Sequence, residues 1–203
     1  MDTTKIHLSE EEMDLLKNSH WILTKNAVIE KVILGMGRLL TQMQQEVEEK
    51  KYLLMQDIVD SSGKISRGEK YQGLPYVMLD YPRIFDRENI LAIRTLFWWG
   101  NFYSVTLHLK GKYLALITPG ILQSLPQLLS YNMFLSFGED EWSHDVHSEH
   151  YKALASFDMQ ELVETIRQAP FLKLTGKVEF SQWEKTETDL FVFFRTLVSL
   201  GAG

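Results

Sequence analysis

A glycine–asparagine pair between two apolar runs is the feature that most constrains how this chain can fold. Residues 90–99 and 102–110 are rich in aromatic and aliphatic side chains, and Gly100-Asn101 separates them. Glycine and asparagine tolerate the positive φ angles that a two-residue hairpin turn requires. The sequence therefore predicts an antiparallel hairpin at this point.

The predicted register pairs Trp99 with Phe102 and assigns each side chain of the hairpin to one of two faces. In this register Arg94 is the single charged residue of the face that we expect to pack on the core. A buried guanidinium needs an anionic partner, and Asp80 on the preceding predicted strand is nearest in sequence. Arg94 is therefore interpreted as part of a buried pair with Asp80, as a group reaching the sheet edge, or as a ligand-binding group for carboxylate or phosphate.

His108 lies on the other predicted face, among aromatic and hydroxyl side chains. Such a face either packs under a helix, which we favour, or lines a pocket with a few polar groups. Asp80 and Arg83 come at the end of the predicted strand 74–81, where functional loops often begin. Asp80, Arg83, Arg94 and His108 are thus the candidate ligand-binding residues.

The remaining strand patterns predict an antiparallel sheet of about four to six strands. Strands are expected at 74–81, 132–137 and 171–180 in addition to the hairpin, whereas 113–117 reads equally well as strand or helix. We expect one α+β domain over 1–203, since the strands cluster in the middle and helical patterns flank them. Its parts are a long N-terminal helical region 10–59, a sheet formed mainly by 74–137 and 171–180, and a C-terminal helix–strand–helix region 156–200, with helices from both ends covering the sheet.

The longest helical pattern covers residues 21–59. A continuous helix of that length would measure about 58 Å, against a diameter of roughly 43 Å for a globule of this size. Either the helix breaks at Gly35 or Gly37, which we favour, or its overhang packs on a second chain and forms a homodimer through residues 29–54. Apolar residues recur along it at spacings of four and three, as in a helix that packs along another helix: Ile29, Ile33, Met36, Leu40, Met43 and Val47.

Three shorter helices are predicted from capping boxes. An N-cap acceptor followed three residues later by glutamate satisfies the free N–H groups of a first helical turn. The pairs Ser9/Glu12, Asp158/Glu161 and Ser181/Glu184 predict helices near 10–18, 159–169 and 182–200.

Composition excludes several classes of function. There is no cysteine among the 203 residues, which removes disulfides, thiolate nucleophiles and cysteine-ligated zinc. The net charge is −6 and no basic stripe is present, so nucleic-acid binding is not expected. Residues 113–138 carry no charge, but proline, glycine and amide residues interrupt them, so no membrane span is expected either. The polar N-terminus lacks a signal-peptide pattern, and we expect a soluble cytoplasmic protein.

Three histidines spaced three residues apart form the strongest candidate for a metal site. Imidazole and carboxylate are the ligand set for zinc, nickel or copper, but this spacing spreads the side chains over about 120° of a helix. A solvated connection is therefore the competing interpretation of His144, His147 and His150, which Glu139, Asp140, Glu141, Asp145 and Glu149 surround.

No catalytic or cofactor motif is present from which a reaction could be named. We therefore expect a non-catalytic domain that binds a partner, itself included, or a small ligand. The alternative is an enzyme of unrecognised type, with a pocket near Asp80, Arg94 and His108 or a metal site at 144–150.

Overall fold

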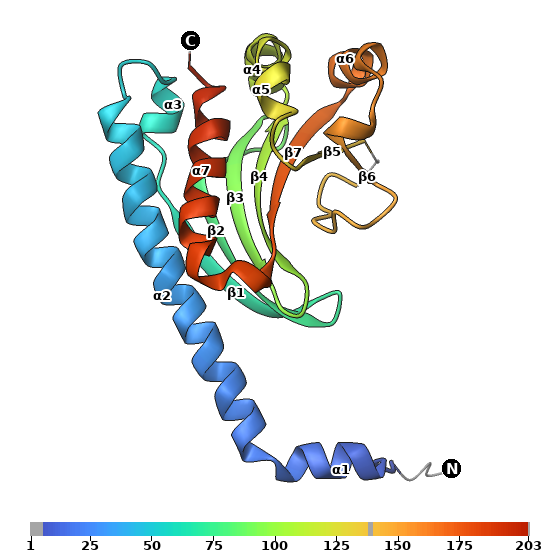
Figure 1. Cartoon of the computed structure of the whole chain (residues 1–203). Coiled ribbons are helices and arrows are strands. Elements are labelled where there is room, and N and C mark those ends of the chain that lie inside the picture. Colours follow the sequence, from blue (N-terminus) through green and yellow to red (C-terminus); the bar gives the residue numbers. More distant parts are fainter. Residues whose placement is uncertain (1–5, 138–139, 203) are drawn as a thin grey trace.

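An antiparallel sheet with helices on one face gives this protein an α+β fold, as predicted (Figure 1). The computed structural model describes residues 6–137 and 140–202. Neighbouring strands are all antiparallel, and their order across the sheet is β1-β2-β3-β4-β7-β5-β6. The strands are β1 Lys64–Tyr71, β2 Leu74–Phe85, β3 Ile90–Trp98, β4 Phe102–Lys110, β5 Met133–Ser136, β6 Tyr151–Ala153 and β7 Phe171–Val178.

Helices from both ends of the chain cover one face of this sheet. Figure 1 shows α2 and α7 side by side on that face, with α4, α5 and α6 gathered at one end of the sheet. The main core lies between these helices and the apolar rows of the strands. The helices are α1 Glu10–Lys17, α2 Ser19–Glu49, α3 Gln56–Val59, α4 Lys112–Gln123, α5 Leu125–Leu128, α6 Met159–Gln168 and α7 Thr186–Ser199, with short 3-10 turns η1 Leu154–Ser156 and η2 Phe180–Lys185.

The predicted hairpin is present, but its register is shifted by one residue. Trp98, and not Trp99, pairs with Phe102, so three residues form the turn. The N–H of Asn101 donates to the carbonyl of Trp98 at 3.1 Å, and Gly100 takes the positive φ of 74° that this turn requires. A one-residue shift moves side chains to the opposite face. Arg94 therefore pairs with Thr106 and shares its face with His108, away from α2 and α7.

Among the described residues the sheet has seven strands. Two of them, β1 and β6, are additional to the five strands that were located from the sequence. β1 is an edge strand whose charged side chains give no apolar alternation, and charged edges are common because they discourage further pairing. β6 has only three residues and borders the opposite edge. β2 continues past Pro82 to Phe85 with a register shift against β3, since proline is accommodated where regular pairing is interrupted.

The helical pattern 21–59 is broken as predicted, but the break comes after Glu49 and not at Gly35 or Gly37. α2 runs without interruption from Ser19 to Glu49, about 46 Å at ~1.5 Å per residue, and includes both Gly35 and Gly37. A glycine inside a helix costs only about 1 kcal/mol, which the packing of this helix offsets. The buried stripe is wider than the predicted seam because α2 packs on both the sheet and α7. It contains Ile29, Val32, Met36, Leu39, Met43, Glu46 and Val47, whereas Ile33 and Leu40 are half-buried.

Two of the three predicted capping sites are confirmed. Ser9 and Glu12 form a complete capping box at α1, and the Asp158 carboxylate accepts the N–H groups that open α6. Ser181 does not start the last helix, because η2 comes first and α7 begins at Thr186. The undecided segment 113–117 is helical, within α4. Within the described ranges, no helix has the length and apolar character needed to cross a membrane.

Candidate functional site

Asp80 and Arg94 form a two-point ion pair on the sheet face opposite α2 and α7. The two residues are direct cross-strand partners on β2 and β3. Arg94 Nε donates to Asp80 Oδ1 at 2.7 Å, and Arg94 Nη2 donates to Asp80 Oδ2 at 3.0 Å. The predicted pair is thus confirmed, and this fork geometry is the strong, directional form of an arginine–carboxylate contact.

The third nitrogen of the Arg94 guanidinium, Nη1, forms a hydrogen bond with His144. Arg94 Nη1 lies 2.9 Å from His144 Nε2, and because a guanidinium only donates, this nitrogen accepts. Burial, followed by the charges of Lys173 and Arg94, lowers the pKa of His144 well below its ordinary value. The backbone N–H of His144 donates to Tyr71 Oη at 2.7 Å, so β1 and β3 both hold this residue.

Lys173 on β7 is completely buried, which is rare for a lysine. Its ammonium donates to the carbonyl of Ser143, and none of the described carboxylates forms an ion pair with it. Burial, reinforced by the positive charge of Arg94, lowers the pKa of Lys173 to about 7. The ionisable groups that surround it are Arg94 on β3, His108 on β4, Tyr151 on β6, and Asp140, Glu141 and His144 in the loop 140–150.

His108 lies beside Lys173 as its cross-strand partner on β4. Burial and the neighbouring cations lower the pKa of His108 to about 3, so its imidazole is neutral. Glu141 Oε2 approaches His108 Nε2 only to 3.7 Å, too far for a hydrogen bond, and both atoms lack partners. The other Glu141 oxygen accepts from Lys110 Nζ at 2.9 Å.

These groups form two adjacent polar rows across a sheet face that the loop 140–150 covers. One row contains Asp80, Arg94, Thr106 and Thr175, whose two threonine hydroxyls lie 3.0 Å apart. The other contains His108, Lys173, Ser136 and Tyr151. Sequence reasoning missed Lys173, Ser143 and Tyr71. For Lys173 the available signal was the alternation of polar residues with Leu172 and Leu174 along β7.

Arg83 lies apart from this polar face. Its side chain is exposed, and its backbone N–H donates to Ser61 Oγ at 2.7 Å. It borders a shallow depression together with Asp57 and Tyr113. The structure therefore brings together three of the four predicted ligand-binding residues, Asp80, Arg94 and His108, and leaves Arg83 outside.

The three histidines of the predicted metal motif do not converge. His144 contacts Arg94, whereas His147 lies against the Phe102 ring with its Nε2 atom 3.4 Å from Lys177 Nζ. The carbonyl of His150 accepts the N–H of Phe137. Residues 6–137 and 140–202 contain no group of three or more histidine or acidic side chains placed to hold a metal ion, and Glu139 lies outside the described residues.

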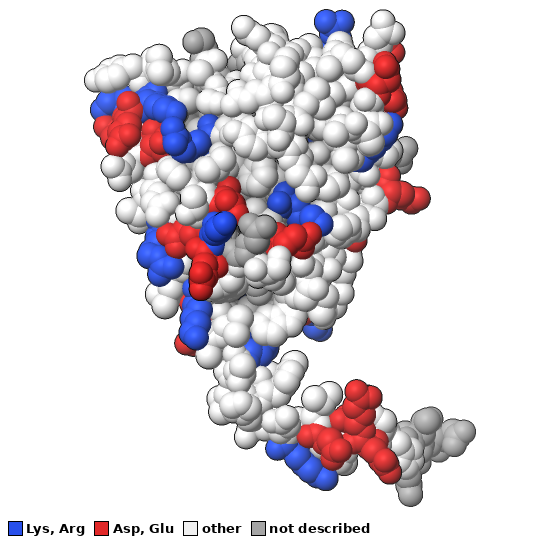
Figure 2. Space-filling view, in the orientation of Figure 1, with Lys and Arg blue, Asp and Glu red and all other residues white. Residues whose placement is uncertain are grey.

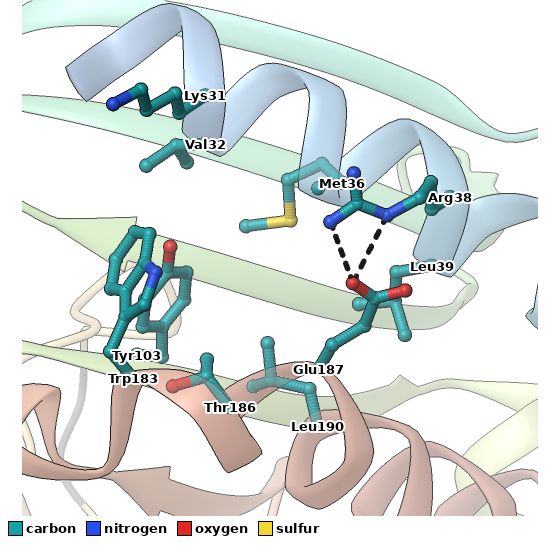
Figure 3. A pocket seen from close by; sticks show the side chains of 11 residues that line it. Lys31, Val32, Met36, Arg38, Leu39, Tyr103, Trp183, Thr186, Glu187 and Leu190 are labelled. Carbon is teal, nitrogen blue, oxygen red and sulfur yellow. Dashed lines mark hydrogen bonds and ion pairs between the residues drawn. The ribbon is translucent and has the colours of Figure 1, made fainter.

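A second concave feature lies between α2 and α7 (Figure 3). Val32, Met36 and Leu190 line it, with the phenol of Tyr103 and the indole of Trp183 at one end. At the other end Arg38 donates twice to one carboxylate oxygen of Glu187. The pocket is small, with a cavity volume of about 80 Å³, and it is open to solvent on one side. Its charged groups are at the rim, so its interior suits an apolar group.

A third feature is the N-terminal arm, which we define as residues 6–24. Figure 1 shows α1 and the first turns of α2 projecting away from the sheet and the other helices. All of its residues are exposed, and contacts with the sheet begin at Lys25, which pairs with Glu69 on β1. The arm nevertheless exposes eight large apolar side chains: Ile6, Leu8, Met13, Leu15, Leu16, Trp21, Ile22 and Leu23.

No family model, curated protein or solved structure matches this chain.

Proposed function

We propose that this is a partner-binding protein, and that its partner is a second copy of the same chain held through the N-terminal arm. The observation that carries this proposal is an apolar stripe of α2 that continues beyond the part of the molecule able to cover it. The interface is therefore placed at residues 6–24. The stripe within 29–54 that first suggested a dimer packs inside the chain, on the sheet and α7.

The covered and uncovered parts of this stripe lie on the same side of one straight helix. Ile29 and Val32 are buried against the sheet side. Ile22 precedes Ile29 by seven residues, and Trp21 precedes Val32 by eleven, and each spacing returns to the same side of an α-helix within about 20°. Trp21 and Ile22 are nevertheless 51% and 42% exposed, because the sheet does not reach them. A second copy supplies a surface of the right character.

The area of the arm fits an interface of ordinary size. At roughly 100 Å² each, eight apolar side chains expose on the order of 800 Å², which is about what one partner contributes to a standard interface. Two arms that pack on each other would bury the arm surface of both copies at once, as an isologous two-fold interface requires.

The short helix α1 also favours a packed partner. Helices of fewer than about 12 residues are marginal in water without tertiary packing, and α1 has eight residues and buries none of them. Figure 2 shows acidic side chains gathered on α1 at the end of the arm, and they include Glu10, Glu11 and Glu12. Amphipathic helices that bind membranes carry lysine and arginine instead. The charge of α1 therefore argues for a protein partner and against a lipid surface.

The test is the mass of the full chain in solution as a function of concentration. Sedimentation equilibrium from micromolar to near-millimolar protein is expected to show a reversible monomer–dimer equilibrium. Ile22→Asp and Leu16→Asp each place a charge in the interface twice, once per copy, and should weaken association by about 100-fold.

Leu116→Asp is the matched control for these variants. Leu116 is an equally apolar, 63% exposed helical residue, but it lies on α4. We expect this variant to dimerise like the unmodified chain. A wild-type chain that stays monomeric at the highest concentration would refute self-association, as would an equal effect of all three aspartates.

A further inference from the structure

Two cations under the loop 140–150, the buried Lys173 and the partly buried Arg94, donate to neutral acceptors of consecutive loop residues. Lys173 donates to the Ser143 carbonyl, and Arg94 donates to His144 Nε2. The Ser143 carbonyl also accepts the Tyr151 hydroxyl at 2.8 Å, so one oxygen receives both an ammonium and a phenol. Ser143 and His144 are adjacent in the chain, so the two cations converge on one place although β4 separates their strands.

The fixed charges at this place leave one cation without a carboxylate. Asp80 pairs with Arg94, and Glu141 pairs with Lys110, but neither reaches Lys173. Asp140 is exposed, and its carboxylate accepts the N–H of Trp142 at 2.8 Å. A buried charge that lacks a counterion is costly, and an anion within reach of the Lys173 ammonium would offset that cost.

Two further buried polar atoms flank the lysine without partners. Ser136 and His108 are the cross-strand neighbours of Lys173 on its two sides, and they are 2% and 4% exposed. Neither Ser136 Oγ nor His108 Nε2 has a hydrogen-bond partner among the described residues, and the equally free Glu141 Oε2 lies 3.7 Å from His108 Nε2. Buried polar atoms are nearly always satisfied, so a pair of free ones beside an uncompensated cation indicates a binding role.

From this arrangement we infer that Arg94 and Lys173, with Ser136 and His108 beside them, form a site for a small oxyanion, and that the loop 140–150 occupies this site when no anion is bound. The ligand is a carboxylate or a phosphate, whose oxygens would replace the Ser143 carbonyl and the His144 imidazole as acceptors. Asp80 stays with Arg94 and fixes the orientation of its guanidinium. The site is separate from the N-terminal arm, and it stands whether or not the chain dimerises.

The loop is the competitor of the anion, so loosening the loop should strengthen anion binding. Tyr71 Oη accepts the backbone N–H of His144 and thereby holds the loop down. Tyr71→Phe removes this one bond and keeps the ring that packs on Trp98. One hydrogen bond is worth about 1 kcal/mol net, so the variant should bind the anion about five-fold more tightly.

The experiment is calorimetric titration of the full chain at pH 6 with sodium phosphate and with sodium acetate, against sodium chloride at matched ionic strength. We expect saturable binding of phosphate or acetate and none of chloride, and the more effective of the two identifies the ligand class. Lys173→Met should weaken binding at least about ten-fold, since a charged donor is lost. Hydrogen exchange of amides 140–150 should increase when the anion binds.

Lys177→Met is the matched control, because Lys177 lies on the same strand and face but pairs with Glu179 at 2.6 Å. It should bind the anion like the unmodified chain. Tyr71→Phe keeps the test decisive if Lys173→Met does not fold. The inference is overturned if neither the wild type nor Tyr71→Phe binds either anion saturably, or if the two lysine variants lose binding equally.

Discussion

The two faces of the sheet are built on different principles. Toward α2 and α7, leucine and isoleucine form continuous apolar rows, such as Ile93, Leu107, Leu174 and Leu135 on four neighbouring strands. Toward the loop 140–150, the intervening positions carry the buried Asp80, Lys173 and His108 and the partly buried Arg94. Apolar packing needs only matching volume, whereas each buried polar group needs a partner of the right chemistry.

This difference determines which substitutions each face of the sheet tolerates. On the face toward α2 and α7, which we call the helical face, an apolar side chain can be replaced by another of similar size. That face therefore tolerates conservative substitution. On the face toward the loop 140–150, which we call the loop face, individual polar atoms pair with each other. Removal of one polar group leaves its hydrogen-bond partner unsatisfied. The loop face is therefore where substitution should have chemical and not merely steric consequences.

The largest effect should come from separating the ion pair. Asp80→Leu leaves the partly buried Arg94 guanidinium without its carboxylate and should lower the free energy of unfolding by about 3 kcal/mol. The double variant Asp80→Leu/Arg94→Met should recover most of this loss, because two packed apolar side chains need no partner. Urea denaturation measures both. A double variant no more stable than the single one would show that the loop face depends on volume, like the helical face.

Lys173 should make stability depend on pH. Its pKa is about 7 in the folded chain and ordinarily 10.5, so between these values the unfolded chain binds one proton more. Stability should therefore rise with pH in this window, by at most about 1.4 kcal/mol per unit. Lys173→Met should remove this rise. Urea midpoints at pH 7, 8 and 9 for both chains provide the measurement, and identical slopes would contradict the prediction.

The smallest predicted change in stability comes from the helical face, where the polar Thr95 lies among apolar side chains. Thr95 is completely buried, and its hydroxyl has no partner among the described residues. Thr95→Val keeps the shape and removes the unsatisfied group, so it should raise the free energy of unfolding by about 1 kcal/mol. Thermal denaturation is sufficient to detect this change. Destabilisation instead would mean that polar groups on this face also have chemical partners.

Local patterns predicted most of the elements of this fold. The hairpin, the strand 171–180 and the helices near 10–18 and 159–169 follow from turn residues, alternation and capping, which act within a few residues. The ion pair of Asp80 and Arg94 could be predicted because a buried guanidinium requires a carboxylate. The strand β1 could not, because a charged edge strand lacks the alternation that marks a half-buried one.

The polar site could be predicted only in part, since it depends on non-local contacts. The register of the hairpin differs by one residue because the turn takes up Trp99, whose N–H donates to the carbonyl of Pro75. That contact with another strand is invisible in the local sequence, yet it assigns Arg94 to its face. Lys173 and Ser143 are 30 residues apart and meet only because the loop folds back over β7.

The lateral borders of the sheet limit how copies of this chain can assemble. One border is formed by the charged strand β1 and the other by the three residues of β6, so neither offers an incoming strand a long apolar ladder. Growth by strand addition, the route to fibres, is thereby disfavoured at both ends. The proposed association uses helices instead, and a self-complementary pair of arms would close on itself after two copies.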